Sequence, residues 1–245
     1  GGTVTNTRAS STPSPIYTPA VLPSFSTRDE SNVNRRETYV LRLSALYEGE
    51  NGLSLLPAVF YQNDSLANPA EVFRDREPYT TAFRISQPTD EEAAIYSLTA
   101  AQDFGPATLT SLTAYFDRKL DWFRDYSFIT GTFVPPLYPL TGTNLSASRT
   151  KTFSQEVRLA SNPDNGSPLT WLVGLFYSHQ DDRIVQTALS QGASAFLGSD
   201  LIFFGDTRTV TRQYAAFGEA TYSILPGLDL TAGVRLFRIK QEVDS

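Results

Sequence analysis

The stretch TRQYAAFGEATYSILPGLDLTAGVRLFRI, residues 211–239, decides the fold class of this chain. In its second half, apolar residues occupy every other position from Leu228 to Leu236, and polar residues such as Thr231 lie between them. A period of two residues is the signature of a β-strand. The tetrapeptide LPGL at 225–228 carries the Pro-Gly signal of a turn. The stretch therefore predicts two antiparallel strands, 211–224 and 228–239, joined by a tight turn.

The same hairpin pattern recurs three times upstream. The further predicted strands are 38–47 with 53–62, 94–104 with 107–122, and 152–160 with 169–178. Pro57 interrupts one of them, which a sheet tolerates at a bulge or where a ladder hydrogen bond is missing. Residues 1–37 are rich in Ser, Thr and Pro and predict an irregular loop or tail. The chain thus divides into this segment and a β-domain of about eight strands in four hairpins, residues 38–245.

The lengths of the connections alternate strictly. Tight turns near residues 50, 106, 165 and 226 alternate with long segments at about 63–93, 123–151 and 179–210. Loops longer than ~15 residues are uncommon in compact soluble domains. Outer-membrane barrels have this alternation, because their periplasmic turns are short and their extracellular loops are long. The fold class predicted is all-β, a segment of an antiparallel up-and-down transmembrane β-barrel.

Aromatic residues recur in pairs along three predicted strands. The pairs, each eight residues apart, are Tyr39 with Tyr47, Tyr96 with Phe104, and Tyr214 with Tyr222. An even separation places both members on one face, and eight tilted steps span roughly 20 Å of membrane normal. Small or apolar residues lie between the members, with Gln102 as the exception. This face is predicted to contact outer-membrane lipid.

The opposite face is mostly polar, although Leu46, Ile95 and Phe217 break the pattern. The charged residues predicted to face the barrel lumen are Arg42, Glu156, Arg158, Glu219 and Arg235. They are expected either to contact a plug or line a channel, or to form salt bridges with one another. A soluble β-sandwich is the alternative fold. It requires Tyr39, Leu43, Tyr214 and Leu230 to be buried together in a core.

Composition excludes several functional classes. The formal net charge of −6 argues against a nucleic-acid partner, which requires a basic stripe. The chain has no Cys and one His, so neither Cys-based nor multi-His metal sites are expected, and no cofactor is expected. Motifs for nucleotide binding and a nucleophile elbow are also missing, and His179 beside two aspartates is interpreted as an exposed polar residue. We therefore do not expect an enzyme. Because the sequence contains no Met, we expect a processed chain or an internal slice of a longer one.

Five segments together resemble the TonB-dependent receptors of Gram-negative outer membranes. They are TFSQEVRLAS (152–161), NPDNGSP (162–168), LTWLVGLFYS (169–178), YAAFGEATYSI (214–224) and LDLTAGVRL (228–236), with ATLTSLTAYFD (107–117) also fitting. Each is weak alone, but their order is that of the family. The resemblance implies a barrel of 22 strands, plugged by an N-terminal domain and energised by the inner-membrane TonB complex. This chain departs from the pattern, since the plug domain, the TonB-contacting segment and the final strand are not among its residues.

The function expected is therefore active uptake, through the outer membrane, of a ferric siderophore or another bulky nutrient. Aromatic and Arg residues of the predicted outer loops are the candidate ligand-binding residues, because stacking and charge together suit an anionic iron chelate. They are Arg74, Arg76, Tyr79, Arg84, Phe133 and Tyr138. The same residues are alternatively expected to pack the loops against each other. Two other functions stay open from the residues: a secreted β-sandwich that binds glycans, and a passive general porin.

Overall fold

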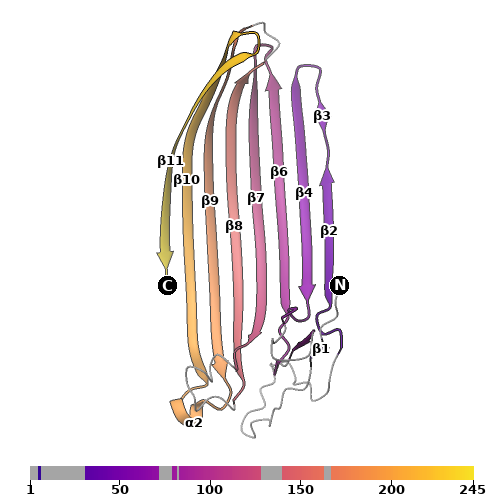
Figure 1. The fold of residues 1–245 in the computed structure, drawn as a ribbon, viewed down its shortest axis with the longest axis vertical. Helices are drawn as coiled ribbons and strands as arrows, with labels where there is room; N and C mark the ends of the chain where they lie inside the picture. The colour runs from indigo at the N-terminus through magenta and orange to yellow at the C-terminus, as the bar shows by residue number, and fades with distance from the viewer. Residues whose placement is uncertain (1–4, 7–30, 72–78, 82, 128–139, 163–166) are drawn as a thin grey trace.

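The computed structural model describes residues 5–6, 31–71, 79–81, 83–127, 140–162 and 167–245, most of which form one long curved sheet (Figure 1). The strands of this sheet are β2 (Arg36–Ser44), β3 (Tyr47–Glu48), β4 (Leu53–Leu66), β6 (Thr89–Asp103), β7 (Ala107–Asp125), β8 (Gly142–Ser161), β9 (Leu169–Ser190), β10 (Leu201–Leu225) and β11 (Leu228–Asp244). Their spatial order is β11-β10-β9-β8-β7-β6-β4-β2, with β3 also on β4, and every pair is antiparallel. Sequence neighbours are therefore sheet neighbours, which confirms the predicted up-and-down topology.

The tight turns gather at one end of the sheet, and the longer connections gather at the other (Figure 1). Gly52, Gly105 and Gly227 occupy three of the turns with φ of 81°, 91° and 83°. Positive φ is readily accessible only to glycine, so these residues fix the turn positions that the sequence predicts. On the turn side, the strands of the four hairpins begin and end within one residue of the prediction, and the first of them is interrupted at residues 45–46.

Pro57 lies within β4, opposite the short gap that separates β2 from β3. The Ala45 N–H donates to the Pro57 carbonyl at 3.2 Å, but proline has no N–H with which to return the bond. On its other side, β4 stays paired with β6 in unbroken register, with Pro57 opposite Leu98. The missing ladder bond therefore falls beside β2 and β3, at the edge of the sheet, where it costs least.

The loop-side ends of the strands differ from the prediction. The ladders continue into residues expected to be loop: β6 begins at Thr89, β7 ends at Asp125, β8 begins at Gly142, β9 ends at Ser190, β10 begins at Leu201 and β11 ends at Asp244. The connections shrink to 67–88, 126–141 and 191–200, and the last contains the one-turn helix α2 (Ser194–Leu197). These extensions carry charged or polar residues on both faces, so the hydrophobic alternation that predicts a strand is missing there.

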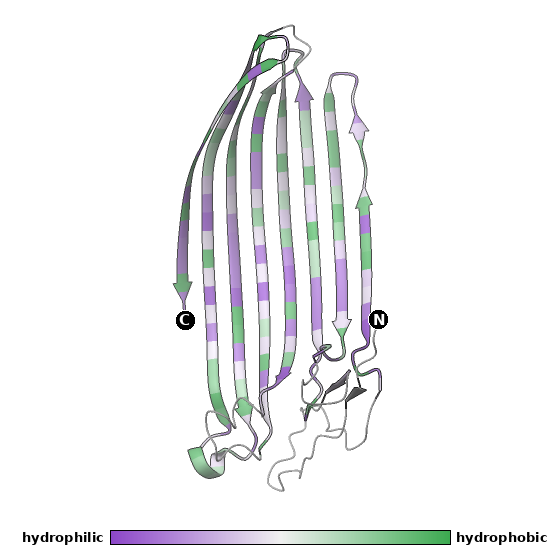
Figure 2. Cartoon of the chain, in the orientation of Figure 1, coloured by the Kyte–Doolittle hydropathy of each residue, from purple (hydrophilic) through white to green (hydrophobic). Residues whose placement is uncertain are grey.

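The described residues contain almost no hydrophobic core. Only Ile85, Ala94, Ala188, Ala193 and Ala215 are buried among the described apolar residues, and four of these five are alanines. The four residues that a soluble sandwich needs in its core, Tyr39, Leu43, Tyr214 and Leu230, are 66%, 66%, 51% and 63% exposed. The β-sandwich alternative is therefore wrong. Hydrophobic and hydrophilic residues instead alternate along the strands of a single layer (Figure 2).

Residues 1–37, which were predicted to be irregular, contain the two-residue strand β1 (Thr5–Asn6) and the first two residues of β2. β1 pairs in parallel with β5 (Thr80–Thr81), and β2 already begins at Arg36. Within the described residues, no helix has the length and apolar character needed to cross a membrane.

Candidate functional site

Along several strands the sequence predicts an apolar side and a polar side. The register of the strands shows that these sides line up into two continuous faces of the sheet. Residues directly opposite each other on neighbouring strands lie on the same face. Leu43 is opposite Val59, Val59 is opposite Tyr96, and the same relation continues to β11, where Ala216 is opposite Leu236. We call this side the apolar face. Its described residues between the predicted aromatic pairs are uncharged.

One row of aromatic residues on the apolar face marks the end of this uncharged band on the loop side. We call it the aromatic belt: Tyr39, Tyr61, Tyr96, Tyr115, Phe153, Tyr177 and Tyr214. Its members step gradually along the strands, as expected where strands tilt against a flat interface. The ring centroids of Tyr177 and Tyr214 are 5.1 Å apart, and those of Phe153 and Tyr177 are 6.3 Å apart. Three members of the belt, Tyr39, Tyr96 and Tyr214, belong to the aromatic pairs predicted from the sequence. The other four are identified only by the strand register.

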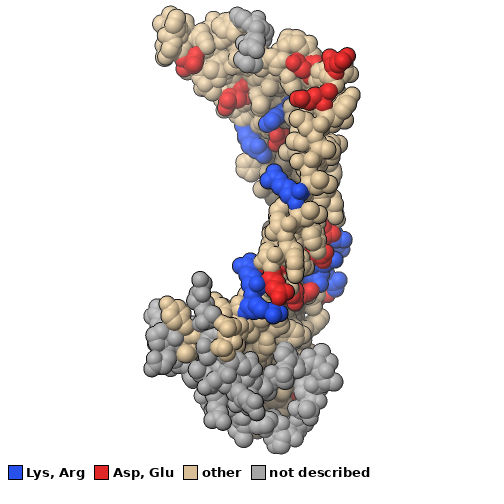
Figure 3. Space-filling model, turned by 90° about the vertical axis from the view of Figure 1, so that its right-hand side faces the viewer, with Lys and Arg blue, Asp and Glu red and all other residues tan. Residues whose placement is uncertain are grey.

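The opposite side, which we call the polar face, carries all five residues predicted to face the lumen: Arg42, Glu156, Arg158, Glu219 and Arg235. Seen from the β2 edge, the sheet is curved, and Lys and Arg side chains at mid-height project into its hollow (Figure 3). The apolar face is uncharged at that height, so the hollow side is the polar face. A hollow polar face and a bulging apolar face match the wall of a barrel.

Arg235 is held by aromatic rings and not by a carboxylate. Its guanidinium carbon lies 5.3 Å from the ring centroid of Phe217 and 5.9 Å from that of Phe176. The Phe217 ring in turn covers Gly174, where a Cβ would meet ring carbons at 2.3, 2.7 and 2.9 Å. Phe217 therefore breaks the polar pattern because it fills the space that Gly174 leaves and supports Arg235.

Mutual salt bridges account for little of the charge of the five residues predicted to face the lumen. Glu156 and Arg158 approach to 3.9 Å along one strand. Arg42, Glu219 and Arg235 form no ion pair with any residue that the structure describes. These three charged groups are thus available to a partner in the hollow.

At the loop end, a hydrogen-bond network ties two connections together. The Arg84 guanidinium donates to the Leu140 carbonyl at 2.9 Å, and the Arg84 backbone N–H donates to Asp125 Oδ2 at 2.5 Å. The Asp125 N–H donates to Gln87 Oε1 at 3.0 Å, and the Gln87 N–H donates to Asn68 Oδ1 at 2.7 Å. We call these residues the loop clasp. Arg84 thus links the connection after β4 to the one after β7.

Small polar residues are buried next to the connection after β9, residues 191–200. The Gln191 N–H donates to the Thr141 carbonyl at 2.9 Å, which joins the connection after β9 to the one after β7. Thr143 and Ser190 are fully buried, and their hydroxyl oxygens have no hydrogen-bond partner among the described residues.

The structure describes two of the six candidate ligand-binding residues. Tyr79 is 65% exposed with φ of 63°, a conformation uncommon for a bulky residue. Arg84 lies in the loop clasp. Arg74, Arg76, Phe133 and Tyr138 lie outside the described residues. Groups of three or more residues able to hold a metal ion are absent from the described part of the chain.

Asp64 gives a test of the electrostatics at the loop end, beyond Tyr39 of the aromatic belt. Its Oδ1 accepts from Arg36 Nε at 2.7 Å and from the Thr38 hydroxyl at 2.5 Å. The Arg36 bond first, and the Thr38 bond second, hold the pKa of Asp64 below its usual range. A lowered folded pKa contributes stability above the unfolded pKa of about 3.9, and this is lost as the pH falls through the folded pKa.

We therefore expect Asp64→Asn to lower the free energy of unfolding by about 1–2 kcal/mol at pH 7. The difference from the native protein should shrink below about pH 4, where the unfolded chain takes up a proton on Asp64 that the folded protein takes up only at lower pH. Urea unfolding of the lipid-reconstituted protein across this pH range measures the effect. Asp229→Asn is the control, because Asp229 forms no ion pair with a described residue. An equal, pH-independent loss in both variants would contradict the assignment.

Solved structures with the same fold include an uptake receptor, a transporter and a siderophore receptor. The chain is similar to the ferric yersiniabactin uptake receptor FyuA from Yersinia pestis, with a TM-score of 0.68 and 12% identity over 90% of this chain and 32% of that one. It is similar to the ferric citrate transporter FecA, with a TM-score of 0.65 and 13% identity over 88% of this chain and 32% of that one. A third match is the siderophore receptor PiuA from Acinetobacter baumannii, with a TM-score of 0.51 and 10% identity over 85% of this chain and 39% of that one.

The chain spans about a third of the length of these structures. At such low identity the likeness establishes the fold alone, and no curated protein sequence matches the chain. A family model is more informative, because the TonB dependent receptor-like β-barrel model matches residues 25–245. That match covers all the strands of the large sheet, including the hairpin 211–239 with which the sequence analysis began. The chain therefore belongs to the TonB-dependent receptor β-barrel family.

Proposed function

We propose that this chain forms part of the wall of a TonB-dependent receptor that takes up a ferric siderophore, or a similarly bulky nutrient, across the outer membrane of a Gram-negative bacterium. One observation carries the proposal: a continuous uncharged face, bounded by the aromatic belt, backs a hollow face with unpaired charges. Lipid on one side and water or a plug on the other is the arrangement that such a wall needs. The family match supports the choice of an energised receptor over a passive porin.

Within this wall, residues 38–245 are proposed to be barrel and residues 1–37 a loop ahead of it. Arg42, Glu219 and Arg235 face the lumen and contact the plug domain of the complete receptor. The TonB complex is the proposed energy source, acting through that plug and not through these residues. An iron chelate is the proposed cargo, because the three similar structures are described as taking up or binding iron complexes.

The connections after β4 and β7 are proposed to hold the cargo through Arg74, Arg76, Tyr79, Phe133 and Tyr138. The loop clasp supports this, because it brings these two connections together at the mouth of the hollow face. Arg84 belongs to the same site but is proposed to act mainly by positioning, since its guanidinium is bound to the Leu140 carbonyl.

Uptake of radioactive iron as a set of chelates tests the proposal, using the full-length product of the gene in cells with and without TonB. We expect uptake of one chelate class that requires TonB. Replacing Arg74 and Arg76 with Gln should weaken chelate binding at least about tenfold, because hydrogen bonds to charged groups are worth about 1.5–3 kcal/mol each. The Arg→Lys versions keep the charge and should retain part of the affinity.

Two results would contradict the proposal in different ways. Uptake that is equal with and without TonB would support the porin alternative. TonB-dependent uptake that is unchanged in the Arg74→Gln, Arg76→Gln variant would keep the transport function but move the cargo site elsewhere.

A further inference from the structure

Four cations lie side by side in one row across four neighbouring strands. We call Lys119, Arg149, Arg183 and Arg208 the cation row. Each is directly opposite the next: Lys119 on β7 faces Arg149 on β8, which faces Arg183 on β9, which faces Arg208 on β10. Neighbouring strands are ~4.8 Å apart, and like charges directly opposite each other destabilise a sheet. A row of four such residues therefore needs a compensating partner.

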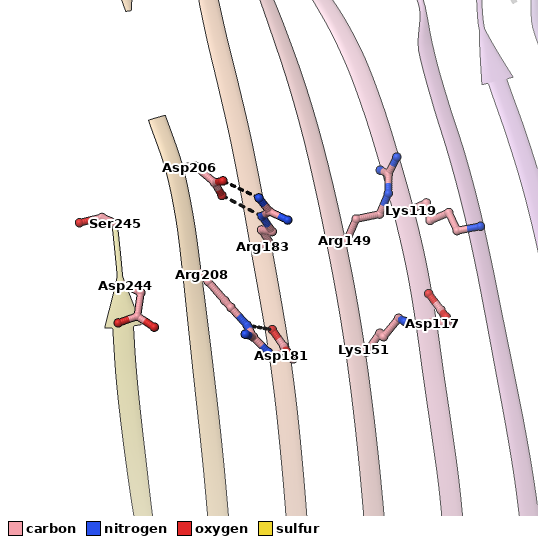
Figure 4. A pocket seen from close by; sticks show the side chains of 10 residues that line it. All are labelled: Asp117, Lys119, Arg149, Lys151, Asp181, Arg183, Asp206, Arg208, Asp244 and Ser245. Carbon is pink, nitrogen blue, oxygen red and sulfur yellow. Dashed lines mark hydrogen bonds and ion pairs between the residues drawn. The ribbon is translucent and has the colours of Figure 1, made fainter. Parts of the chain in front are cut away.

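The protein itself supplies part of the compensation. Arg149 pairs with Asp121 at 2.9 Å. Arg183 pairs with Asp206 at 2.5 Å, and Arg208 pairs with Asp181 (Figure 4). Lys119 pairs at 3.3 Å with Glu92, which lies directly opposite it on β6 and so belongs to the same row of the sheet.

The three aspartates lie in the rows above and below, so between Lys119 and Arg208 only cations share the row. The four cationic side chains remain 53%, 41%, 58% and 55% exposed. Each Arg of the row already donates two hydrogen bonds to its aspartate, which holds the side chain in place. A guanidinium group carries five N–H donors, so each still has donors for a further acceptor on its exposed side.

The position of the cation row suggests what completes it. The row lies on the apolar face, four to six residues beyond the aromatic belt toward the loops: Lys119 follows Tyr115, and Arg208 precedes Tyr214. At about 3.3 Å per residue and a tilt of about 40°, this is roughly 10–15 Å farther along the membrane normal. Headgroups occupy about 5–8 Å outside the hydrocarbon on each side, and Lys and Arg side chains reach back toward them. The cation row therefore borders the headgroup layer of the leaflet on the loop side.

We propose that the cation row binds the phosphate groups of an anionic lipid in that leaflet. Phosphate oxygens accept forked hydrogen bonds from guanidinium groups, and a row of cations on a sheet matches a lipid that carries more than one phosphate. The net charge of the whole chain is −6, so general electrostatic attraction does not explain lipid binding, whereas this local arrangement does. The inference rests on the proposed membrane placement of the apolar face. It adds a lipid partner on the outside of the wall, separate from the cargo site.

Titration of the full-length protein with bis-phosphorylated lipid A, in nanodiscs of otherwise neutral phosphatidylcholine, tests the proposal. The first variant replaces all four cations with Gln. A Lys or Arg near a charged membrane surface contributes about 1 kcal/mol, which is about fivefold in affinity. Because each cation is already paired, we expect a loss smaller than the full product but at least about tenfold. The control replaces Arg42, Arg118, Arg158 and Arg235 on the polar face with Gln and should bind lipid A as the native protein does.

A second variant separates the row from the ion pairs. It exchanges partners: Arg183→Asp with Asp206→Arg, and Arg208→Asp with Asp181→Arg. The pairs and the net charge are kept, but two cations leave the row. We expect lipid A affinity to fall, but by less than in the Gln variant, because Lys119 and Arg149 stay in the row. Native-like binding by the exchanged protein, or equal displacement of the lipid by inorganic phosphate, would overturn the proposal, because the cations would then serve the ion pairs or bind any phosphate.

The same preparations distinguish this inference from the transport proposal. Both variants should still insert into the outer membrane and take up the chelate that the native protein takes up. Loss of lipid A binding with intact insertion and uptake supports a separate lipid site. Intact lipid binding in a protein that transports no chelate would contradict the transport proposal alone.

Discussion

Leu175→Arg should destabilise the membrane-inserted protein by about 1–3 kcal/mol. Arg on the lipid face of a barrel costs about 2–4 kcal/mol at the bilayer midplane and less toward the interfaces, and Leu175 lies two residues inside Tyr177 of the aromatic belt. Leu175 lies on the apolar face and is 65% exposed, with Val157 and Ala216 opposite it on the neighbouring strands. In a membrane, this exposed surface is covered by hydrocarbon, where the guanidinium loses its hydration. Urea unfolding from vesicles of a short-chain phosphatidylcholine measures the free energy of unfolding.

Ser178→Arg is the matched control on the same strand. Ser178 lies on the polar face, so the new charge points into the hollow and should cost less than about 1 kcal/mol. Equal effects of the two substitutions would show that the two faces contact the same medium. That result would refute the membrane placement on which the proposed function and the lipid site both depend.

Gly174→Ala should destabilise the protein by about 1–3 kcal/mol, although alanine is usually a mild substitution in a strand. The new methyl group would lie 2.3 Å from Phe217 Cζ, so the ring has to move. Moving it also disturbs the position of Arg235 over Phe217, and such a contact is worth about 0.5–1 kcal/mol at an exposed site. Unfolding in urea again measures the loss.

A double-mutant cycle tests whether the contact with the ring is the cause. In a Phe217→Ala background the space is open, so Gly174→Ala should cost little. Gly233→Ala is a second control, since a Cβ there meets its nearest atom at 3.4 Å, close to an ordinary van der Waals distance. If Gly174→Ala cost the same with and without the Phe217 ring, the destabilisation would have to come from the backbone and not from this packing.

The functional side chains were only partly predictable from the sequence. Alternation within single strands placed Glu219 and Arg235 on the polar face, and the register agrees. Phe217 looked like an exception to that pattern until the register placed it against Gly174. Arg84 was predicted to bind a ligand, yet its guanidinium is bound to a carbonyl 56 residues away in the sequence. Contacts over such separations leave no signal in local periodicity.

The cation row was missed for a related reason. Arg149, Arg183 and Arg208 lie in stretches that read as polar loop, because charged residues there occupy both faces of the strand. Hydrophobic alternation identifies a strand only where one face meets hydrocarbon. Beyond the membrane both faces meet water, and the hairpins continue by backbone pairing and cross-strand ion pairs such as that of Arg183 with Asp206.

The sequence by itself determined the hairpin turns and which side chains of each membrane-spanning strand share a face. Both depend on neighbours in the chain: glycine at a positive φ, and a side-chain period of two residues. Tertiary structure alone decided how far the strands extend past the membrane, which residues meet across strands, and therefore the cation row, the loop clasp and the Phe217 contact. Those features depend on pairing between distant segments, and the free energy that fixes such pairing is a property of the assembled sheet and not of any one strand.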